Sequence, residues 1–528
     1  MRQSLMPLTD DRQHIKIRGR RYTAPPLTST CSVVCQSYSE DDNTGGKKLK
    51  NDRIANTTSF ITALVAFAER RVIKMEQKKD RVKFSSKIGF VLAAASSAVG
   101  LGNLWRFPYL AAKYGGGIFL LTYIVLALTF GFSLLVAEIA IGRKTGLSSV
   151  AAFKKLGQKS NICGILGMVI PMIITPYYCT IGGWVTKYFA TFVTGQYKQA
   201  ATDDYFTGFI TSDFGPVLFL FIFLLLTTVI VLLGVQKGIE KASVILMPIL
   251  LGLIVIISIY VVTRPGATAG LSYYFKPDFS KISGKLILGA LGQLFYSNSI
   301  AMGIMITYGS YMEKKENLVN SVHQIEFFDS VVAILAGLII VPSVYIFSGG
   351  DASAMGAGPG LMFVTLPKVF DSFPGGGLAG IAFFALVLFA ALTSAISLLE
   401  AVVSNIMDLT RMSRFKATIL SAVYCVVVGS LCSLGFGPLS FVKIIGFDIL
   451  DFLDFISNSV MMPVLAFFTA VFIGFKLKPE FLIAEAEEGG ASFRLKKFWA
   501  FMIKWICPIG IVAILVSSIL SGFGLLSL

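Results

Sequence analysis

Eleven stretches of this 528-residue chain are long, apolar and bounded by charged or turn-forming residues. A helix needs about 20 apolar residues to cross the roughly 30 Å of hydrocarbon in a bilayer. We therefore expect an all-α polytopic membrane protein with about eleven spanning helices. The composition agrees, because 55% hydrophobic and 14% charged residues are not typical of soluble domains. The expected spans are residues 88–112, 118–141, 163–193, 216–233, 242–262, 286–311, 320–348, 376–404, 417–434, 450–475 and 499–523.

The positive charges predict the orientation of these spans. With the amino terminus in the cytoplasm, the inner loops would hold 22 Lys and Arg residues and the outer loops nine. Cytoplasmic loops of membrane proteins carry an excess of Lys and Arg. We predict a multi-pass protein of the cell inner (plasma) membrane, with a cytoplasmic amino terminus and, because the number of spans is odd, an outer carboxyl terminus. Much of the net charge of +16 then reflects this bias, and no feature indicates nucleic-acid binding.

Residues 1–74 differ from the rest of the chain. They are mainly polar, and their one apolar stretch, residues 60–68, is too short to cross a membrane. They also lack the basic segment, longer apolar core and cleavage site of a signal peptide. We expect Met75, which opens a charged segment before the first span, to be the natural start; the alternative is a disordered cytoplasmic tail. The membrane domain is expected over residues 75–523.

Residues that bind metals or catalyse reactions are scarce. The seven Cys are scattered between Cys31 and Cys507 without paired spacing, and His14 and His323 are the only histidines. The sequence therefore does not indicate disulfide frameworks, zinc sites or His-based catalysis. We expect neither an enzyme nor an organic cofactor. A channel would need rings of repeated charges or carbonyls, whereas the charges within these spans are single.

Gly- and Ser-rich interruptions occur in two spans, at residues 96–103 of the first and 297–303 of the sixth. Backbone polar groups inside a bilayer need partners, so such interruptions are costly unless they line a site. The alternative is that small residues merely permit tight helix packing. A matched pair in spans one and six favours two inverted five-helix repeats, at about 88–262 and 286–475, followed by an extra helix at about 499–523. The half-helix ends would offer N–H groups to an anion and carbonyls to a small cation.

Residues 98–103 read AVGLGN and residues 105–109 read WRFPY, which is a very specific combination. With these motifs the chain resembles the neurotransmitter:sodium symporter family, in its bacterial eleven-helix branch. Supporting matches are KGIEK at 237–241, GQLFYS at 292–297, ITYGSY at 306–311 and LTSAIS at 392–397. The resemblance covers about residues 80–523. It implies sodium-coupled uptake of an amino acid or amine by alternating access.

Two sodium ions near the middle of the membrane are implied by the resemblance. The first would be bound by the carbonyls of Ser96, Val99 and Ala390 and the hydroxyls of Thr393 and Ser394. The second would be bound by the Ala98 carbonyl, Asn103, Ser297, a group on the seventh span placed at Asp329, and the carboxylate of the substrate. Oxygen ligands of this kind suit a small cation. Because the second ion and the substrate share a bond, each would raise the affinity of the other.

Asp329 marks a departure from the family pattern, which commonly has Asn at this position. Chloride-dependent members hold their anion beside the second sodium with residues equivalent to Tyr123, Gln293 and Ser297. A carboxylate at Asp329 would supply the negative charge itself. We therefore predict transport that does not depend on chloride.

Gly100 indicates the class of substrate. Amine transporters of the family have Asp here, which pairs with an ammonium group, whereas Gly100 offers room and no charge. We expect an amino acid whose carboxylate meets the second sodium, the N–H groups near Gly100 and Gly102, and the Tyr178 hydroxyl. The other expected substrate-binding residues are Ala98, Ile174, Tyr296, Ser297, Ser299, Met302, Ser394 and Leu398. This mainly apolar lining favours a neutral hydrophobic or aromatic amino acid.

Two charged pairs are expected to gate the path. Arg106 and Asp454 would close the outer side, and Arg81 and Asp408 the inner side. A transporter-like receptor is the remaining alternative to a carrier. The identity of the amino acid and the oligomeric state stay open.

Overall fold

The computed structural model describes residues 14–17, 20–23, 82–158, 161–348, 358–488 and 490–525. The chain divides into two compact units, Met1–Lys79 and Asp80–Leu528. In the first unit, strands β1 (His14–Ile17) and β2 (Arg20–Thr23) pair antiparallel. The remainder of residues 1–74 lies outside the described residues, so the expected late start or disordered tail stays a prediction.

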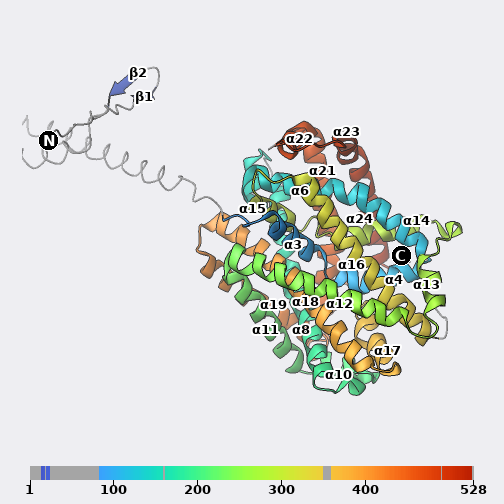
Figure 1. The fold of residues 1–528 in the computed structure, drawn as a ribbon. Coiled ribbons are helices and arrows are strands. Elements are labelled where there is room, and N and C mark those ends of the chain that lie inside the picture. Colours follow the sequence, from blue (N-terminus) through green and yellow to red (C-terminus); the bar gives the residue numbers. More distant parts are fainter. Residues whose placement is uncertain are drawn as a thin grey trace, which may run out of the picture. The chain divides into compact units, whose positions relative to one another are not determined.

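The second unit is built of helices (Figure 1). Elements labelled η are short helices of other types: η4 is a 3-10 helix, and the others named below are π-helices. The first half contains α3 (Lys87–Ala98), η1 (Gly102–Arg106), α4 (Phe107–Lys113), α5 (Gly117–Leu126), η2 (Ala127–Gly131), α6 (Phe132–Thr145), α7 (Ser149–Lys155), α8 (Ile162–Val193), α9 (Tyr197–Ala200), α10 (Asp204–Ile210), α11 (Gly215–Leu232), η3 (Val235–Glu240) and α12 (Lys241–Val262). The second half contains α13 (Ala267–Phe275), η4 (Phe279–Lys281), α14 (Gly284–Ser297), α15 (Ile304–Tyr311), α16 (Leu318–Phe347), η6 (Leu361–Thr365), α17 (Leu366–Ser372), α18 (Gly376–Thr410), α19 (Arg414–Leu434), α20 (Ile449–Asp454), η7 (Phe455–Met461), α21 (Met462–Val471) and η8 (Phe472–Leu477). The last elements are α22 (Pro479–Ala486), α23 (Lys496–Phe501), η9 (Met502–Ile506) and α24 (Cys507–Gly522).

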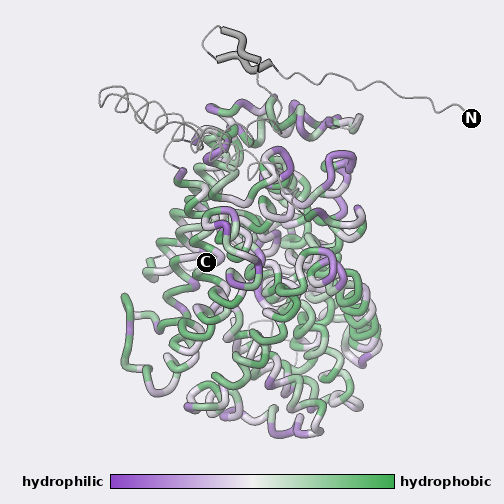
Figure 2. Tube along the Cα trace, turned by 90° about the vertical axis from the view of Figure 1, so that its left-hand side faces the viewer, coloured by the Kyte–Doolittle hydropathy of each residue, from purple (hydrophilic) through white to green (hydrophobic). Residues whose placement is uncertain are grey.

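Nine helices of the described residues are long and apolar enough to cross a membrane, or ten if the bent first pair counts as one span. Hydrophobic residues dominate these helices, and most hydrophilic residues lie in loops and at helix ends (Figure 2). The expected polytopic helical fold is confirmed. The count of eleven stays a prediction, because the expected sixth span is divided between α14 and α15, each too short to qualify alone.

Polar residues fix where several of these helices begin. Ser86, Ser283, Asn317, Ser413 and Asp448 each accept a hydrogen bond from the backbone N–H three residues further on. Such caps satisfy N–H groups that have no partner inside the helix. The change from a polar cap to an apolar run therefore sets the helix start.

Both expected helix breaks are present. The first span bends by 53° between Lys87–Ala98 and Gly102–Lys113. The sixth is unwound over residues 298–303, where Ser299, Ala301 and Gly303 have φ values of 50°, 60° and 70°. Positive φ is rare for residues with a Cβ, so this conformation needs support from its surroundings. The buried carboxylate of Glu138 provides some, because its Oε1 accepts a hydrogen bond of 2.7 Å from the Ala301 N–H.

Candidate substrate and sodium site

A pocket of about 30 Å³ lies between the two helix breaks. Ten of the eleven expected substrate-binding residues line it: Ala98, Gly100, Gly102, Ile174, Tyr178, Tyr296, Ser299, Met302, Ser394 and Leu398. Four further residues line the pocket that were not expected at the substrate: Ser97, Leu101, Asn103 and Ile304. The position of the first three inside the first break, and of Ile304 directly after the second, was the signal that could have found them. Ser297 does not line this pocket.

Hydroxyl groups hold the first break in its unwound conformation. Ser299 Oγ donates a hydrogen bond of 3.0 Å to the Ser97 carbonyl. Ser394 Oγ is 3.1 Å from the Ser97 carbonyl and 3.2 Å from the Val99 carbonyl. Carbonyls released from the helix ladder thus find partners on α18 and on residues 298–303, as backbone groups in a membrane require.

The room expected beside Gly100 is absent in this structure, because Ser394 and Tyr178 close around it. A Cβ at Gly100 would lie 2.8 Å from Ser394 Oγ and 3.2 Å from Tyr178 Oη, and one at Gly102 would overlap the Tyr296 ring. The pocket space corresponds to about one water molecule. An amino acid would therefore require these side chains to move apart, while a larger residue at Gly100 would obstruct the pocket further.

Oxygens expected to bind the first sodium come together at the end of α3 and on α18. Ser394 Oγ contacts the Val99 carbonyl, and Thr393 Oγ1 is 3.1 Å from the Ala390 carbonyl. The Ser96 hydroxyl bonds to Ser243 Oγ at 3.0 Å, which orients the residue whose carbonyl is expected to face the ion. Neutral oxygens of this kind fit a small monovalent cation.

Asp329 is the centre of a second buried cluster. Its carboxylate accepts hydrogen bonds from Asn103 Nδ2 at 2.8 Å, from Ser297 Oγ at 2.8 Å and from Tyr123 Oη at 3.0 Å. Asn103 Nδ2 is also 3.0 Å from Ser297 Oγ. The structure thus joins three side chains expected at the second sodium and the Tyr123 hydroxyl expected at an anion site.

Gln293 contacts the first helix break. Its Nε2 donates a hydrogen bond of 3.0 Å to the Gly102 carbonyl in the first break. Gln293 therefore links α14 to the unwound segment, in addition to the anion-site position expected for it.

The outer gate residues line a second cavity of about 430 Å³. Arg106 and Asp454 both face this cavity, and no ion pair between them occurs within the described residues. The Arg106 guanidinium carbon lies 5.7 Å from the centre of the Tyr296 ring, and Asp454 accepts a hydrogen bond of 2.6 Å from Asn458. Both residues of the expected outer gate thus line one cavity, but their side chains do not form the ion pair that would close it.

The residues of the expected inner gate are tightly packed. The Phe84 ring packs edge-on against Tyr308 and Tyr311 at 5.7 Å and 6.0 Å, and the Phe84 N–H donates a hydrogen bond of 3.1 Å to the Tyr311 carbonyl. Asp408 accepts hydrogen bonds from the N–H and hydroxyl of Ser148 at 2.8 Å and 2.5 Å. Arg81, its expected partner, lies outside the described residues, so that pair stays a prediction.

A further contact beside the expected inner gate was not predicted from the sequence. The buried Glu400 carboxylate accepts a hydrogen bond of 2.6 Å from Tyr311 Oη and two from Arg414 at 2.7 Å and 2.8 Å. An acidic residue within a membrane span requires a partner, so the position of Glu400 in the sequence already indicated that such a contact exists. The sequence does not say which of several inner-loop cations provides it.

Comparison with known proteins shows the family to which the chain belongs. A model of the sodium:neurotransmitter symporter family matches residues 81–213 and 210–523. The chain is 35% identical over 450 residues to YhdH of Bacillus subtilis, an uncharacterized sodium-dependent transporter, covering 84% of this chain and 98% of the relative. It is 32% identical over 458 residues to an uncharacterized sodium-dependent transporter of Haemophilus influenzae, and the match covers 84% of this chain and 99% of that relative.

The crystal structure of MhsT in complex with L-phenylalanine has the same fold. It superposes with a TM-score of 0.75 and 38% sequence identity, covering 83% of this chain and 100% of MhsT. With the matches above, this similarity identifies a transporter and not an enzyme. The chain belongs to the sodium:neurotransmitter symporter family and is a sodium-dependent, multi-pass membrane symporter.

Proposed function

We propose that this protein imports a neutral hydrophobic or aromatic amino acid together with sodium, by alternating access and without a need for chloride. The observation that carries the proposal is the pocket between the two helix breaks. The pocket is lined by the uncharged Gly100 and by the apolar side chains of Ile174, Met302 and Leu398. A substrate carboxylate meets no opposing acid there, and an apolar side chain gains from burial. MhsT, which shares this fold, binds L-phenylalanine.

Two sodium ions accompany the amino acid in this proposal. The first is bound at the end of α3 and on α18, by the Ser96, Val99 and Ala390 carbonyls and the Thr393 and Ser394 hydroxyls. The second is bound by the Ala98 carbonyl, Asn103, Ser297 and Asp329. The first site is supported by the contact of Ser394 on α18 with the Val99 carbonyl and by that of Thr393 with the Ala390 carbonyl within α18. The second is supported by the contacts of Asn103 with Ser297 and Asp329.

Asp329 replaces chloride in this proposal. Tyr123 and Ser297 donate to its carboxylate, as donors to a bound anion would. A fixed negative charge beside the second sodium leaves no electrostatic need for a mobile anion.

The gates and the orientation complete the proposal. The inner side carries the amino terminus and is closed by Phe84, Tyr311 and the Arg81–Asp408 pair, while the outer cavity leads toward the pocket. Closure of Arg106 on Asp454 then seals the outer side. Met75 is the proposed start of the natural protein, which intact-mass analysis of natively expressed protein tests directly.

A thermal-shift screen of twenty amino acids, with sodium and with potassium at equal ionic strength, tests the substrate class. A ligand stabilises the folded protein according to its affinity and concentration. We expect stabilisation by hydrophobic or aromatic amino acids in sodium only. Stabilisation by charged amino acids or amines alone, or equal stabilisation in potassium, would contradict the proposal.

A further inference from the structure

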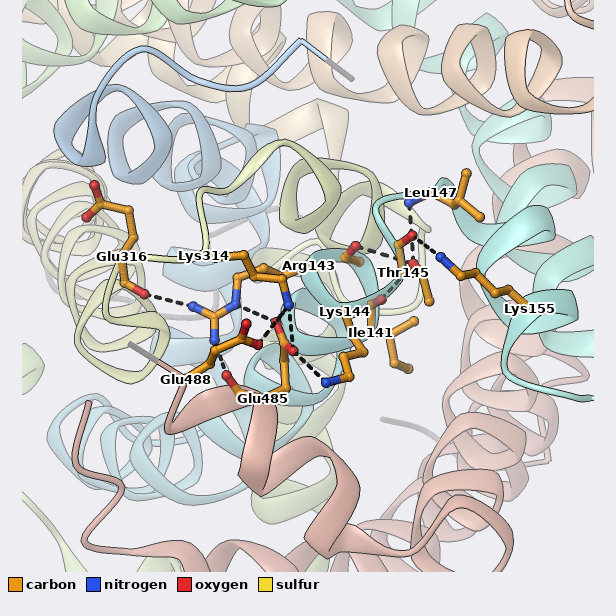
Figure 3. A network of polar contacts seen from close by, with 11 residues as sticks. Ile141, Arg143, Lys144, Thr145, Leu147, Lys155, Lys314, Glu316, Glu485 and Glu488 are labelled. Carbon is orange, nitrogen blue, oxygen red and sulfur yellow. Dashed lines mark hydrogen bonds and ion pairs between the residues drawn. The ribbon is translucent and has the colours of Figure 1, made fainter. Parts of the chain in front are cut away.

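A buried ion cluster around Glu485 joins three segments at one end of the helical unit (Figure 3). The Glu485 side chain is fully buried and lies on α22, in the segment between the last two spans. Its Oε1 is 2.9 Å from Arg143 Nε, and Lys314 Nζ lies 2.6 Å and 2.7 Å from its two oxygens. Lys144 Nζ adds an ion pair of 3.2 Å. One carboxylate thus has three cationic partners.

Arg143 extends the cluster through its remaining nitrogens. Its side chain is fully buried, and it donates a hydrogen bond of 2.7 Å to the Glu316 carbonyl and another to the Glu485 carbonyl. The end of α6, residues 312–317 and α22 are therefore held by one guanidinium group. Lys314 also pairs with Glu488 at 2.9 Å, and this hydrogen bond lowers the pKa of Glu488.

The cluster lies next to the inner closure. Lys314 is three residues beyond Tyr311, which packs against Phe84 and bonds to Glu400. The short segment after α15 is thus fixed from two directions, by Glu400 through Tyr311 and by Glu485 through Lys314.

α15 and α6 pack closely enough to act as one unit. A Cβ at Gly142 would overlap the Ile306 carbonyl, and a Cβ at Gly309 would overlap the Ile139 carbonyl. Contacts between backbones of this kind leave little freedom for the two helices to separate. By contrast, α22 is joined to α6 and to residues 312–317 through the charged groups of Figure 3. α22 also buries Leu482 and Ala486, so the charged groups are the part of this contact that a single substitution can remove while the apolar packing stays.

We propose that Glu485 is a latch that keeps the inner side closed, by fastening α22 across the ends of α6 and α15. This inference rests on the proposed alternating-access transport, in which the inner side must open in each cycle. Removing one partner of a buried ion cluster leaves the others uncompensated, so the closed state loses stability. Neutralising Glu485 shifts the population toward the state with an open inner side.

Hydrogen exchange of the full chain in sodium tests the latch. Glu485→Gln keeps the size of the side chain and removes its charge. Peptides covering α15 and residues 82–90 should exchange about fivefold faster or more, the lower end of typical coupling between sites. Glu487→Gln is the matched control, because Glu487 forms a more exposed pair with Lys496, and exchange should equal that of the wild type.

Lys314→Gln is the second variant, which tests the latch if Glu485→Gln does not fold. Lys314 is 40% exposed, so its replacement buries no new charge. It should accelerate exchange in the same peptides, by a smaller factor. Unchanged exchange of α15 and residues 82–90 in every folded variant, with loosening confined to α22, would overturn the latch. The sodium-dependent thermal shift of the wild type is measured on the same preparation. Its absence would refute the proposed function, whereas its presence with unchanged exchange refutes the latch alone.

Discussion

Replacing Asp329 with Asn removes one negative charge from the proposed second sodium site and keeps the shape of the side chain. The carboxylate accepts from Asn103, Ser297 and Tyr123, so it lies among the groups proposed to bind this ion. Two unit charges about 4 Å apart interact by about 4 kcal/mol at an effective dielectric constant of about 20. Since about 1.4 kcal/mol is a tenfold change, sodium affinity should fall by about 100- to 1,000-fold in the absence of chloride.

Chloride should restore part of that loss in Asp329→Asn, because Tyr123 and Ser297 are then free to donate to a mobile anion. The assay is a sodium titration of amino-acid binding in chloride and in gluconate. Asp451→Asn is the control, because it removes an acid from the outer cavity and should leave the sodium titration unchanged. An Asp329→Asn protein with wild-type sodium affinity in gluconate would refute our account of this carboxylate.

Three other substitutions test separate parts of the structure. Gly100→Asp places a carboxylate in the pocket and should weaken amino-acid binding by about 100-fold or more in an equilibrium binding assay, because this carboxylate repels the carboxylate of the substrate. Unchanged affinity would mean that the substrate carboxylate lies elsewhere. Arg414→Ala leaves the buried Glu400 carboxylate without its cation and should cost about 3–5 kcal/mol, seen as a lower melting temperature in detergent. Gly303→Ala combines a φ of +70° with an overlap on the Gly167 carbonyl and should cost at least about 2 kcal/mol; a melting temperature equal to that of the wild type would count against the unwound conformation.

The sequence predicted the fold and the pocket because both depend on local patterns. Long apolar runs define spans without knowledge of their neighbours. The two Gly- and Ser-rich interruptions likewise mark the breaks, and the motif around Gly100 and Asn103 carries the family's site with it. Ser297 was expected among the substrate-binding residues, but at the end of α14 its side chain donates to Asp329 instead.

The contacts around the expected inner gate and around Glu485 could not be predicted in the same way. Arg143 and Glu485 are 342 residues apart, and Ser148 and Asp408 are 260 apart. Several Lys and Arg residues of the inner loops looked equivalent in the sequence, because the positive-inside bias counts charges without assigning partners. Only the packing of α22 against α6 decides which of them meets Glu485. The small size of the pocket similarly depends on rotamers of Tyr178 and Ser394, which no pattern specifies.

Concentrative uptake in proteoliposomes tests the central claim most directly. Vesicles prepared in potassium gluconate are diluted into sodium gluconate that contains labelled phenylalanine. We predict accumulation above the outside concentration, driven by the sodium gradient and abolished when both sides hold equal sodium. Equilibration without accumulation, or accumulation that needs no sodium gradient, would contradict a sodium-coupled amino-acid carrier.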